Sequence, residues 1–257
     1  MLSVATSETG SQLPAGRPPA TDTQEHAVTT NAQAIADHPA QGTQSLALTL
    51  RDATKDAHVA AEKHPFHGML FSGRLPREAF AAQLAQAMHL QTVLEAGLSR
   101  ASAAPAVSAV VRPHHFRLEL FERDLRAWGV EPAATSASAA TRALGAWIDQ
   151  HASAAPAGLL GVLYVVEGST NGAQFIAKAV RRAYRLADDA PGLASLDPHG
   201  PAQQERWQAF RRDLDLAPLS PPDRAAALQG ANGAFGWASA VMDELMATAA
   251  RAMAARS

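Results

Sequence analysis

Apolar residues recur at every third or fourth position along most of the chain after Gln44, which is the spacing of one face of an α-helix. The first of these runs consists of Leu46, Leu50, Ala53, Ala57 and Ala61. No alternating apolar and polar run between hairpin turns occurs in the sequence, and no internal repeat is found. The pattern therefore predicts an all-α fold in a single domain.

Prolines and glycines divide this pattern into seven expected helices. The first is expected to end before Pro65, and a loop that ends at Ser72 and Gly73 should follow it. The other six are expected over about 76–98, 112–128, 139–152, a stretch that contains 161–180 and ends near 186, then 203–214 and 221–245.

The stretch GVLYVVEGSTNGAQFIAKAV, residues 161–180, combines a buried-helix pattern with an unusual centre. Its expected core residues are Leu163, Val166, Phe175, Ile176 and Val180. Each interior glycine costs a helix roughly 1 kcal/mol relative to alanine. Either the helix ends at Gly168–Gly172, or something outside it compensates for a weak middle.

Gly168 and Gly172 lie one turn apart, and we expect Ala173 to extend the strip free of long side chains that they form. Close packing against another helix is one explanation of such a strip. The polar residues Ser169, Thr170 and Asn171 favour the other explanation, a site where the backbone opens toward water or a ligand.

Composition sets the protein class. The 257 residues are 47% hydrophobic with a formal net charge of −2, which suits a globular protein and gives no argument for binding nucleic acid or an anionic membrane. We expect residues 1–43, poor in large apolar side chains, to form a disordered tail before a helical domain over 44–257. No signal peptide or membrane span is recognisable, so we expect a cytoplasmic protein.

The sequence has no cysteine, which excludes disulfides, thiolate metal sites and cysteine nucleophiles. It has ten histidines but no Glu-x-x-His pair, the signature of carboxylate-bridged di-iron bundles. No nucleotide-binding glycine motif is present either. Any redox chemistry must therefore take its electrons from a partner or a bound cofactor.

His58 is the histidine with the most informative neighbours. It lies at the edge of the first apolar face, with Arg51 two turns before it and Glu62 one turn after it. A carboxylate at that spacing can fix the tautomer of a metal-bound imidazole, and Arg51 could pair with an anionic group of the ligand. The alternative is an interfacial histidine within an ordinary helical ion-pair pattern.

Three stretches together resemble one family. LRDATKDAHVAAEKHPF, residues 50–66, resembles the proximal helix of the heme oxygenases. LYVVEGSTNGAQFIAK, residues 163–178, resembles their distal helix, especially the Glu-Gly-Ser pattern of the bacterial branch. FRRDLDLAPLSPPDRAAALQGANGAFGWASAVMDEL, residues 210–245, resembles their arginine-bearing segment and final helix. The matches follow the family order and span about 200 residues.

The resemblance implies a single-domain helical bundle with heme b between a proximal helix and a kinked distal helix. It implies O₂-dependent cleavage of heme to biliverdin, CO and Fe²⁺, with electrons from a ferredoxin or an NAD(P)H-dependent reductase, and a biliverdin-using protein as a further partner.

The resemblance also assigns roles to individual residues. His58 is implied as the iron ligand and Glu62 as its carboxylate partner. The implied remainder of the site is Arg51 and Arg211 as propionate contacts, Phe235 as a pocket wall, and Gly168 and Gly172 as the glycines that let O₂ bend over the heme edge. Glu167 is expected to pair with a basic residue and is assigned no catalytic role.

The sequence departs from the animal enzymes at two distal positions. Ser169 replaces the aspartate that holds their catalytic water, and Ala173 replaces the second glycine of a pair. How the water is anchored and which meso carbon is attacked are therefore left open.

Two alternatives to a heme oxygenase are a heme-binding or heme-sensing protein without turnover and another member of the wider fold. Such members include non-heme di-iron oxidases and thiamin-related hydrolases, which need clustered ligands or a cysteine.

Overall fold

The protein is described by a computed structural model over residues 44–254, which are helical almost throughout and contain no strand. This confirms the expected all-α fold. The residues from Gln44 onward group into one compact unit. The tail expected over 1–43 lies outside the described residues.

Nine α-helices follow one another along the described chain, joined by short loops and 3₁₀ turns. They are α1 (Leu46–Glu62), α2 (Pro65–Phe71), α3 (Arg77–Arg100), α4 (Pro105–Val110), α5 (Leu118–Ala127), α6 (Ala139–Ala154), α7 (Ala157–Tyr184), α8 (Gln203–Leu216) and α9 (Pro221–Ala254).

Two short helices depart from the sequence-based expectation. Residues 65–71, expected as a loop, form α2, because Pro65 occupies its first turn and the Nδ1 of His64 accepts the Phe66 N–H at 3.2 Å. Helix α4 was not predicted, and it too begins with a proline, Pro105. In both cases the proline marks the start of a helix, whereas the sequence pattern indicates only the end of one.

The helix expected over 112–128 is shorter than predicted. Arg112 is extended before Pro113, residues 113–115 form a 3₁₀ turn, and α5 begins only at Leu118. A carboxylate from α3 caps this start, since Oε1 of Glu95 accepts the N–H of Arg117 at 2.6 Å and of Leu118 at 2.8 Å. The cap lies far away in sequence, so local pattern could not reveal it.

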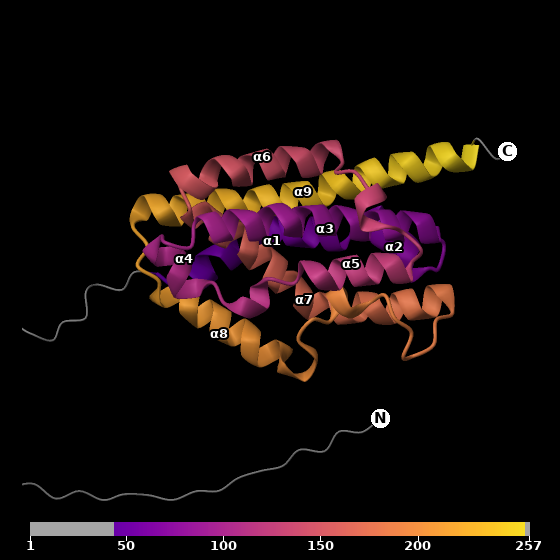
Figure 1. Cartoon of the computed structure of the whole chain (residues 1–257), viewed down its shortest axis with the longest axis horizontal. Helices are drawn as coiled ribbons and strands as arrows, with labels where there is room; N and C mark the ends of the chain where they lie inside the picture. The colour runs from indigo at the N-terminus through magenta and orange to yellow at the C-terminus, as the bar shows by residue number, and fades with distance from the viewer. Residues whose placement is uncertain (1–43, 255–257) are drawn as a thin grey trace, which may run out of the picture. The chain divides into compact units, whose positions relative to one another are not determined.

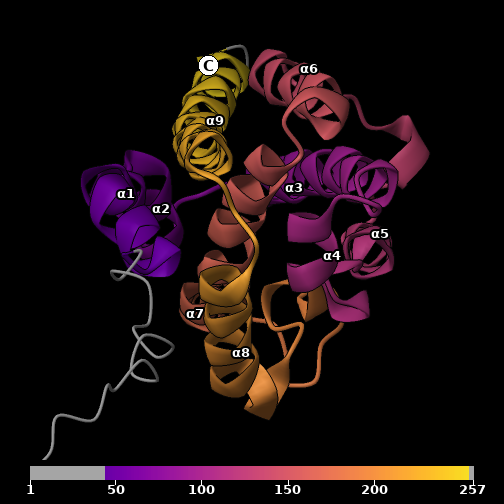
Figure 2. The same cartoon turned by 90° about the vertical axis from the view of Figure 1, so that its left-hand side faces the viewer.

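Helix α9 runs through the bundle, with α1 and α7 packed against it (Figure 1). Viewed along the bundle, α1 and α2 lie to one side of α7, and α3, α5 and α6 lie to the other (Figure 2). Within residues 44–254, α1 and α7 share no extensive contact of their own. Helix α9 therefore determines how α1 and α7 stand relative to each other.

The contact between α7 and α9 is unusually close, because glycines meet backbone there. A Cβ atom added to Gly161 would lie 1.8 Å from the carbonyl oxygen of Ala227, and one added to Gly230 would lie 2.0 Å from that of Gly158. Since no side chain fits between the two backbones, these glycines fix the crossing point of the helices.

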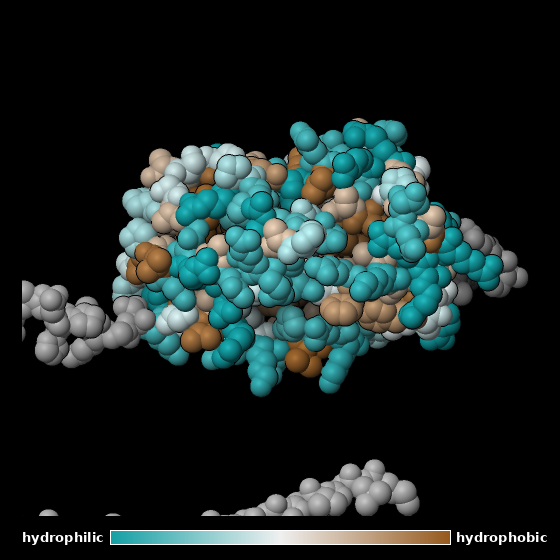
Figure 3. Space-filling view, turned by 90° about the horizontal axis from the view of Figure 1, so that it is seen from below, coloured by the Kyte–Doolittle hydropathy of each residue, from teal (hydrophilic) through white to brown (hydrophobic). Residues whose placement is uncertain are grey.

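The buried apolar residues form three clusters, and the largest of them contains the residues around this crossing. The largest fully buried side chains are Phe66, Leu46, Leu50, Leu70, Leu94, Leu98, Leu125, Ile148, Leu159, Leu160, Leu163 and Leu214. The face seen from below is mainly hydrophilic, with small separate hydrophobic groups (Figure 3). Among the described residues, no helix is long and apolar enough to cross a bilayer.

The start of α1 is tied to the end of α8. Ser45 caps α1 by accepting the Leu48 N–H at 3.1 Å, and its hydroxyl donates to the Asp215 carboxylate at 2.8 Å. The same carboxylate accepts the Ala47 N–H at 2.9 Å. Asp215 therefore anchors the first turn of α1 through a contact far away in sequence.

We expect Gly161→Ala to lower the free energy of unfolding by about 2–4 kcal/mol, because the new methyl group would force the two backbones apart. Gly233→Ala in α9 is the matched control, since its Cβ would meet only Leu144 at 3.7 Å, an ordinary contact. Thermal unfolding measures both variants. A melting temperature of Gly161→Ala equal to that of the wild type would contradict the close crossing.

Candidate functional site

His58 projects from the exposed side of α1, and 55% of its side chain is accessible. Its Nδ1 lies 3.6 Å from an Oε of Glu62, which is close enough for an ion pair but longer than a hydrogen bond. The Phe235 ring of α9 approaches the imidazole edge-on at 5.8 Å between centroids. The predicted His58–Glu62 pair therefore exists, and it involves only the Nδ1 of an imidazole that is more than half exposed.

The opposite side of α1 explains this exposure. Leu46, Leu50 and Thr54 are buried, and the Thr54 hydroxyl donates to the Leu50 carbonyl at 2.7 Å. Ala53, predicted to lie on the apolar face, is exposed instead. The buried face is thus rotated toward Thr54, because a threonine can enter a helix interface once its hydroxyl bonds back to the helix.

Helix α7 continues through its polar centre, so the helix does not end at Gly168. Three successive side chains bond back to carbonyls three residues earlier: Ser169 to Val166 at 2.8 Å, Thr170 to Glu167 at 2.6 Å and Asn171 to Gly168 at 3.0 Å. Such bonds weaken the helical ladder and bend the axis. The early and late turns of α7 run in different directions (Figure 1).

Two faces of this bent segment have different surroundings. Ser169 and Gly172 are exposed, and a Cβ atom added to Gly172 would meet nothing within 4 Å. Close helix packing therefore does not explain Gly172. We call Gly168, Ser169 and Gly172 the distal strip.

Two predictions about α7 are wrong. Phe175, expected in the core, is 68% exposed, because it lies on the same side of the helix as Gly172. Ala173, expected to extend the glycine strip, is buried at 7% exposure. The bend places Gly172 outward, and simple apolar periodicity across it misassigns both residues.

The charges of two arginines from other helices act on Tyr164, one turn before Gly168. Burial raises the pKa of Tyr164, and the charges of Arg211 and Arg51 act against that rise. The hydroxyl of Tyr164 has no hydrogen-bond partner among residues 44–254. Arg51 from α1 and Arg211 from α8 thus both act electrostatically on one tyrosine of α7, although they are far apart in sequence.

The two arginines differ in how their charge is compensated. Arg51 is exposed and pairs with Asp52 at 2.8 Å. Arg211 is half-buried, and no carboxylate of the described residues lies within ion-pair distance of it. Arg211 is therefore the better placed of the two to bind an anionic group.

Sequence reasoning missed the aromatic side chains beside Gly168. A Cβ atom added to Gly168 would lie 3.4 Å from the Trp207 ring. Trp207 packs against Tyr164 at 5.4 Å and Phe210 at 5.8 Å between ring centroids. In the sequence, only Tyr164 could have indicated an aromatic group here, because it lies one turn before Gly168 in the same helix. Trp207 belongs to another helix, so no local pattern connects it to Gly168.

Glu167 forms a buried ion pair, which agrees with the structural role expected for it. Its two carboxylate oxygens lie 2.5 Å from Arg117 and 3.2 Å from Nε2 of His199. Burial works to raise the pKa of Glu167, but the hydrogen bond with His199 and the charge of Arg117 outweigh it and lower the pKa. The group stays ionised inside the protein.

His115 is buried next to this ion pair. Its Nδ1 accepts the Arg112 N–H at 3.0 Å, and its ring lies 4.3 Å from that of His114 between centroids. Burial lowers the pKa of His115 to about 3, so the imidazole is neutral around pH 7.

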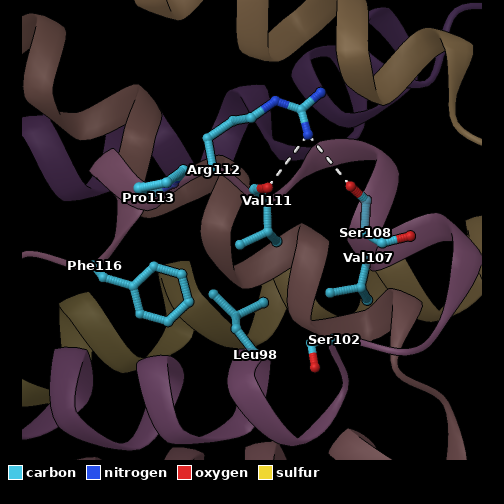
Figure 4. A pocket seen from close by; sticks show the side chains of 8 residues that line it. All are labelled: Leu98, Ser102, Val107, Ser108, Val111, Arg112, Pro113 and Phe116. Carbon is cyan, nitrogen blue, oxygen red and sulfur yellow. Dashed lines mark hydrogen bonds between the residues drawn. The ribbon is translucent and has the colours of Figure 1, made fainter.

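A cavity of about 540 Å³ lies elsewhere, between the end of α3, α4 and the turn that follows α4 (Figure 4). Arg112 borders it, but its guanidinium donates to the carbonyls of Ser108 and Val111 and to the carboxylate of Asp213. None of the predicted site residues lines this cavity.

Comparison with known proteins identifies the family. The model of the heme oxygenase family matches residues 44–244. The chain belongs to the heme oxygenase family. Human heme oxygenase 1 is 25% identical over 198 residues, which are 75% of this chain and 68% of that protein.

Solved structures agree with this assignment. Heme oxygenase-1 of the cyanobacterium Synechocystis sp. PCC6803 in complex with heme has a TM-score of 0.75 at 22% identity, covering 82% of this chain and 97% of that chain. Heme oxygenase-2 of the same cyanobacterium, in complex with heme and NO, has a TM-score of 0.72 at 25% identity, covering 78% and 85%. The expected heme oxygenase-like bundle is therefore confirmed.

The buried histidine predicts a pH dependence of stability. The unfolded chain protonates His115 below about pH 6.5, whereas the folded protein resists this until about pH 3, so stability falls as the pH is lowered between these values. His115→Asn keeps an acceptor for Arg112 and should reduce the slope of unfolding free energy against pH by up to about 1.4 kcal/mol per pH unit. Denaturant unfolding at several pH values measures the slope, and an unchanged slope would contradict the burial of a neutral His115.

Proposed function

We propose that this member of the family is a heme oxygenase that cleaves heme to biliverdin, CO and Fe²⁺ with O₂ and electrons from a ferredoxin or an NAD(P)H-dependent reductase. The proposal is carried by two observations: His58 on α1 is exposed with Glu62 beside its imidazole, and on α7 no protein atom lies within 4 Å of the Cβ position of Gly172. Both helices pack on α9, which also supplies Phe235 beside His58.

The residues present fit heme. The side chain of His58 is more than half exposed and the carboxylate of Glu62 lies near its Nδ1, so a neutral imidazole could ligate iron through Nε2. On α7, the position where Gly172 would carry a Cβ atom is empty of protein, which would give a planar ligand access to the backbone. Heme supplies the iron and the electronic chemistry, and the protein supplies orientation.

The remaining residues orient the substrate. Arg211, half-buried and without a carboxylate partner among residues 44–254, would bind a propionate group, and the Tyr164 hydroxyl beside it would donate a hydrogen bond. Arg51 would add a second positive charge from α1 once its pairing with Asp52 is exchanged. These groups fix the rotation of the ring in its plane.

Ser169 replaces an acidic side chain in this proposal. Its hydroxyl proton is directed to the Val166 carbonyl, so its oxygen is left as an acceptor for water. A water held there would be placed at the distal strip for proton delivery. This is weaker anchoring than a carboxylate, because the acceptor is neutral.

A second candidate is heme binding without turnover, and the neutral Ser169 is the observation that favours it. The two functions share the His58 ligand and differ in the fate of the porphyrin. Purified protein is loaded with hemin and supplied with ascorbate, or with a ferredoxin and its reductase, under air. Loss of the Soret band with growth of a biliverdin absorption supports cleavage, and a lasting Soret band supports binding alone.

We expect His58→Ala to abolish turnover and weaken hemin binding, with imidazole added to the solution restoring an axial ligand. His151→Ala is the control, because this histidine of α6 stacks on Trp147 and contacts no residue of the candidate site. Absorption titration with hemin and the turnover assay measure both variants. Turnover by His58→Ala at the wild-type rate would remove His58 from the site.

We expect Gly172→Ala to have opposite effects on the two forms of the protein. The heme-free protein should gain up to about 1 kcal/mol, since the methyl group meets no atom and alanine favours the helix. Hemin affinity and turnover should fall, because the methyl group occupies the space proposed for the ring. Thermal unfolding and hemin titration give the two results, and a variant that binds hemin as well as the wild type would contradict this placement.

A further inference from the structure

The side of α7 that faces away from the distal strip carries a buried polar network that contact with heme does not require. It joins Arg117 at the start of α5, Glu167 and Thr170 of α7, His199 before α8 and Gln203 of α8. We call these five residues the distal clamp. All of them lie within one turn of Gly168 or contact a residue that does.

The centre of the clamp is closed to solvent. The side chains of Arg117, Glu167 and His199 are each only 4–5% exposed, and both oxygens of Glu167 are engaged. His114 packs edge-on against His199 at 5.5 Å between ring centroids. Burying an ion pair this deeply costs hydration, so apolar side chains of the same size can give the same global stability without the directional contacts that fix one position of the helix.

The clamp extends one turn further along α7. Nε2 of Gln203 donates to the hydroxyl of Thr170 at 2.6 Å and to Oδ1 of Asn171 at 3.2 Å. The hydroxyl of Thr170 in turn donates a hydrogen bond to the Glu167 carbonyl at 2.6 Å. The polar residues at the centre of α7 therefore divide by face, with Thr170 turned to the clamp and Ser169 turned outward.

The backbone of Arg117 is anchored to α3, so its side chain connects α7 to that helix. Glu95 of α3 accepts its backbone N–H at 2.6 Å, and Gln91 holds that carboxylate at 2.7 Å. Helix α3 thus connects to α7 through Glu95, Arg117 and Glu167.

The weak centre of α7 needs contacts with other helices to fix its position. Two glycines and three side chains bonded back to the helix leave its path poorly determined by local preference. We propose that Glu167 is a positioning residue: held by Arg117 and His199, it sets where Gly168 and Ser169 stand over the substrate. This rests on the proposed function for the identity of the substrate, whereas the clamp belongs to the heme-free protein.

The distal strip would contact a small molecule such as O₂ or CO bound to the heme iron. Displacing the strip would therefore change the direction in which that molecule points. Misplacement of a reacting group by about 1 Å can cost on the order of a hundredfold in rate. The ratio of biliverdin isomers is therefore the most direct measure of the effect of the clamp. It depends on which edge of the porphyrin is attacked and not on the amount of folded protein.

Two variants and one control separate positioning from stability. Glu167→Gln keeps the size and weakens the ion pair. Glu167→Leu combined with Arg117→Met removes both charges and should melt near the wild type, because a buried ion pair can be exchanged for apolar side chains. Asp124→Asn is the control: this carboxylate is also fully buried and accepts the Ser195 N–H at 2.6 Å, away from the distal strip.

Hydrogen exchange of the heme-free proteins tests the clamp alone. We expect the amides of residues 166–173 to exchange roughly tenfold faster in both clamp variants and at the wild-type rate in the control, since local opening of a helix raises exchange. Equal exchange in the wild type and the double variant would overturn the inference, whether or not the protein binds hemin.

The second measurement uses the heme-loaded proteins with carbon monoxide as a probe, followed by turnover and separation of the biliverdin isomers. We expect a shifted C–O stretching frequency and a several-fold change in the isomer ratio in the clamp variants only. A double variant that melts like the wild type and gives the same frequency and isomer ratio would overturn the inference. Wild-type protein that fails to bind hemin would instead refute the proposed function, and the exchange experiment would still decide the clamp.

Discussion

The close crossing of α7 and α9 is the constraint on which the rest of the structure depends. Gly161 lies against the backbone of Ala227, and Gly230 against that of Gly158, so the two helices touch without side chains between them. Helix α9 then continues to Phe235, which meets His58 of α1. One helix thus contacts both the first half of α7 and the histidine of α1, and its position is set by a backbone contact at which a larger residue is destabilising.

Helix α7 uses its glycines for two different purposes. In its first half, Gly158 and Gly161 allow close approach to another backbone. In its second half, Gly172 faces a region where no protein atom lies within 4 Å of its Cβ position. The sequence pattern is similar in both halves, but the first glycines are stabilised by packing, whereas Gly172 lowers helix stability without a packing gain. A ligand that binds close to the backbone requires a residue without a side chain, and this would account for a glycine that lowers helix stability.

Much of the fold follows from local pattern, and the errors have identifiable causes. The helices α1, α3, α6, α7, α8 and α9 agree with the apolar periodicity, because each buries one continuous face. Helices α2 and α4 were missed because a proline at a first turn resembles a break. Phe175 was assigned to the core because the periodicity was continued across a bend that three side-chain bonds create.

The sequence by itself determined the all-α class, the pairing of His58 with Glu62 and the weakness of the α7 centre, because each depends on residues within two helical turns of one another. Only the tertiary structure decided which face of α7 is open, that the charges of Arg211 and Arg51 act on Tyr164, and that Arg117 and His199 hold Glu167. Those relations join residues from different helices. They depend on how close two backbones can come, and that distance is set by packing between segments far apart in the chain.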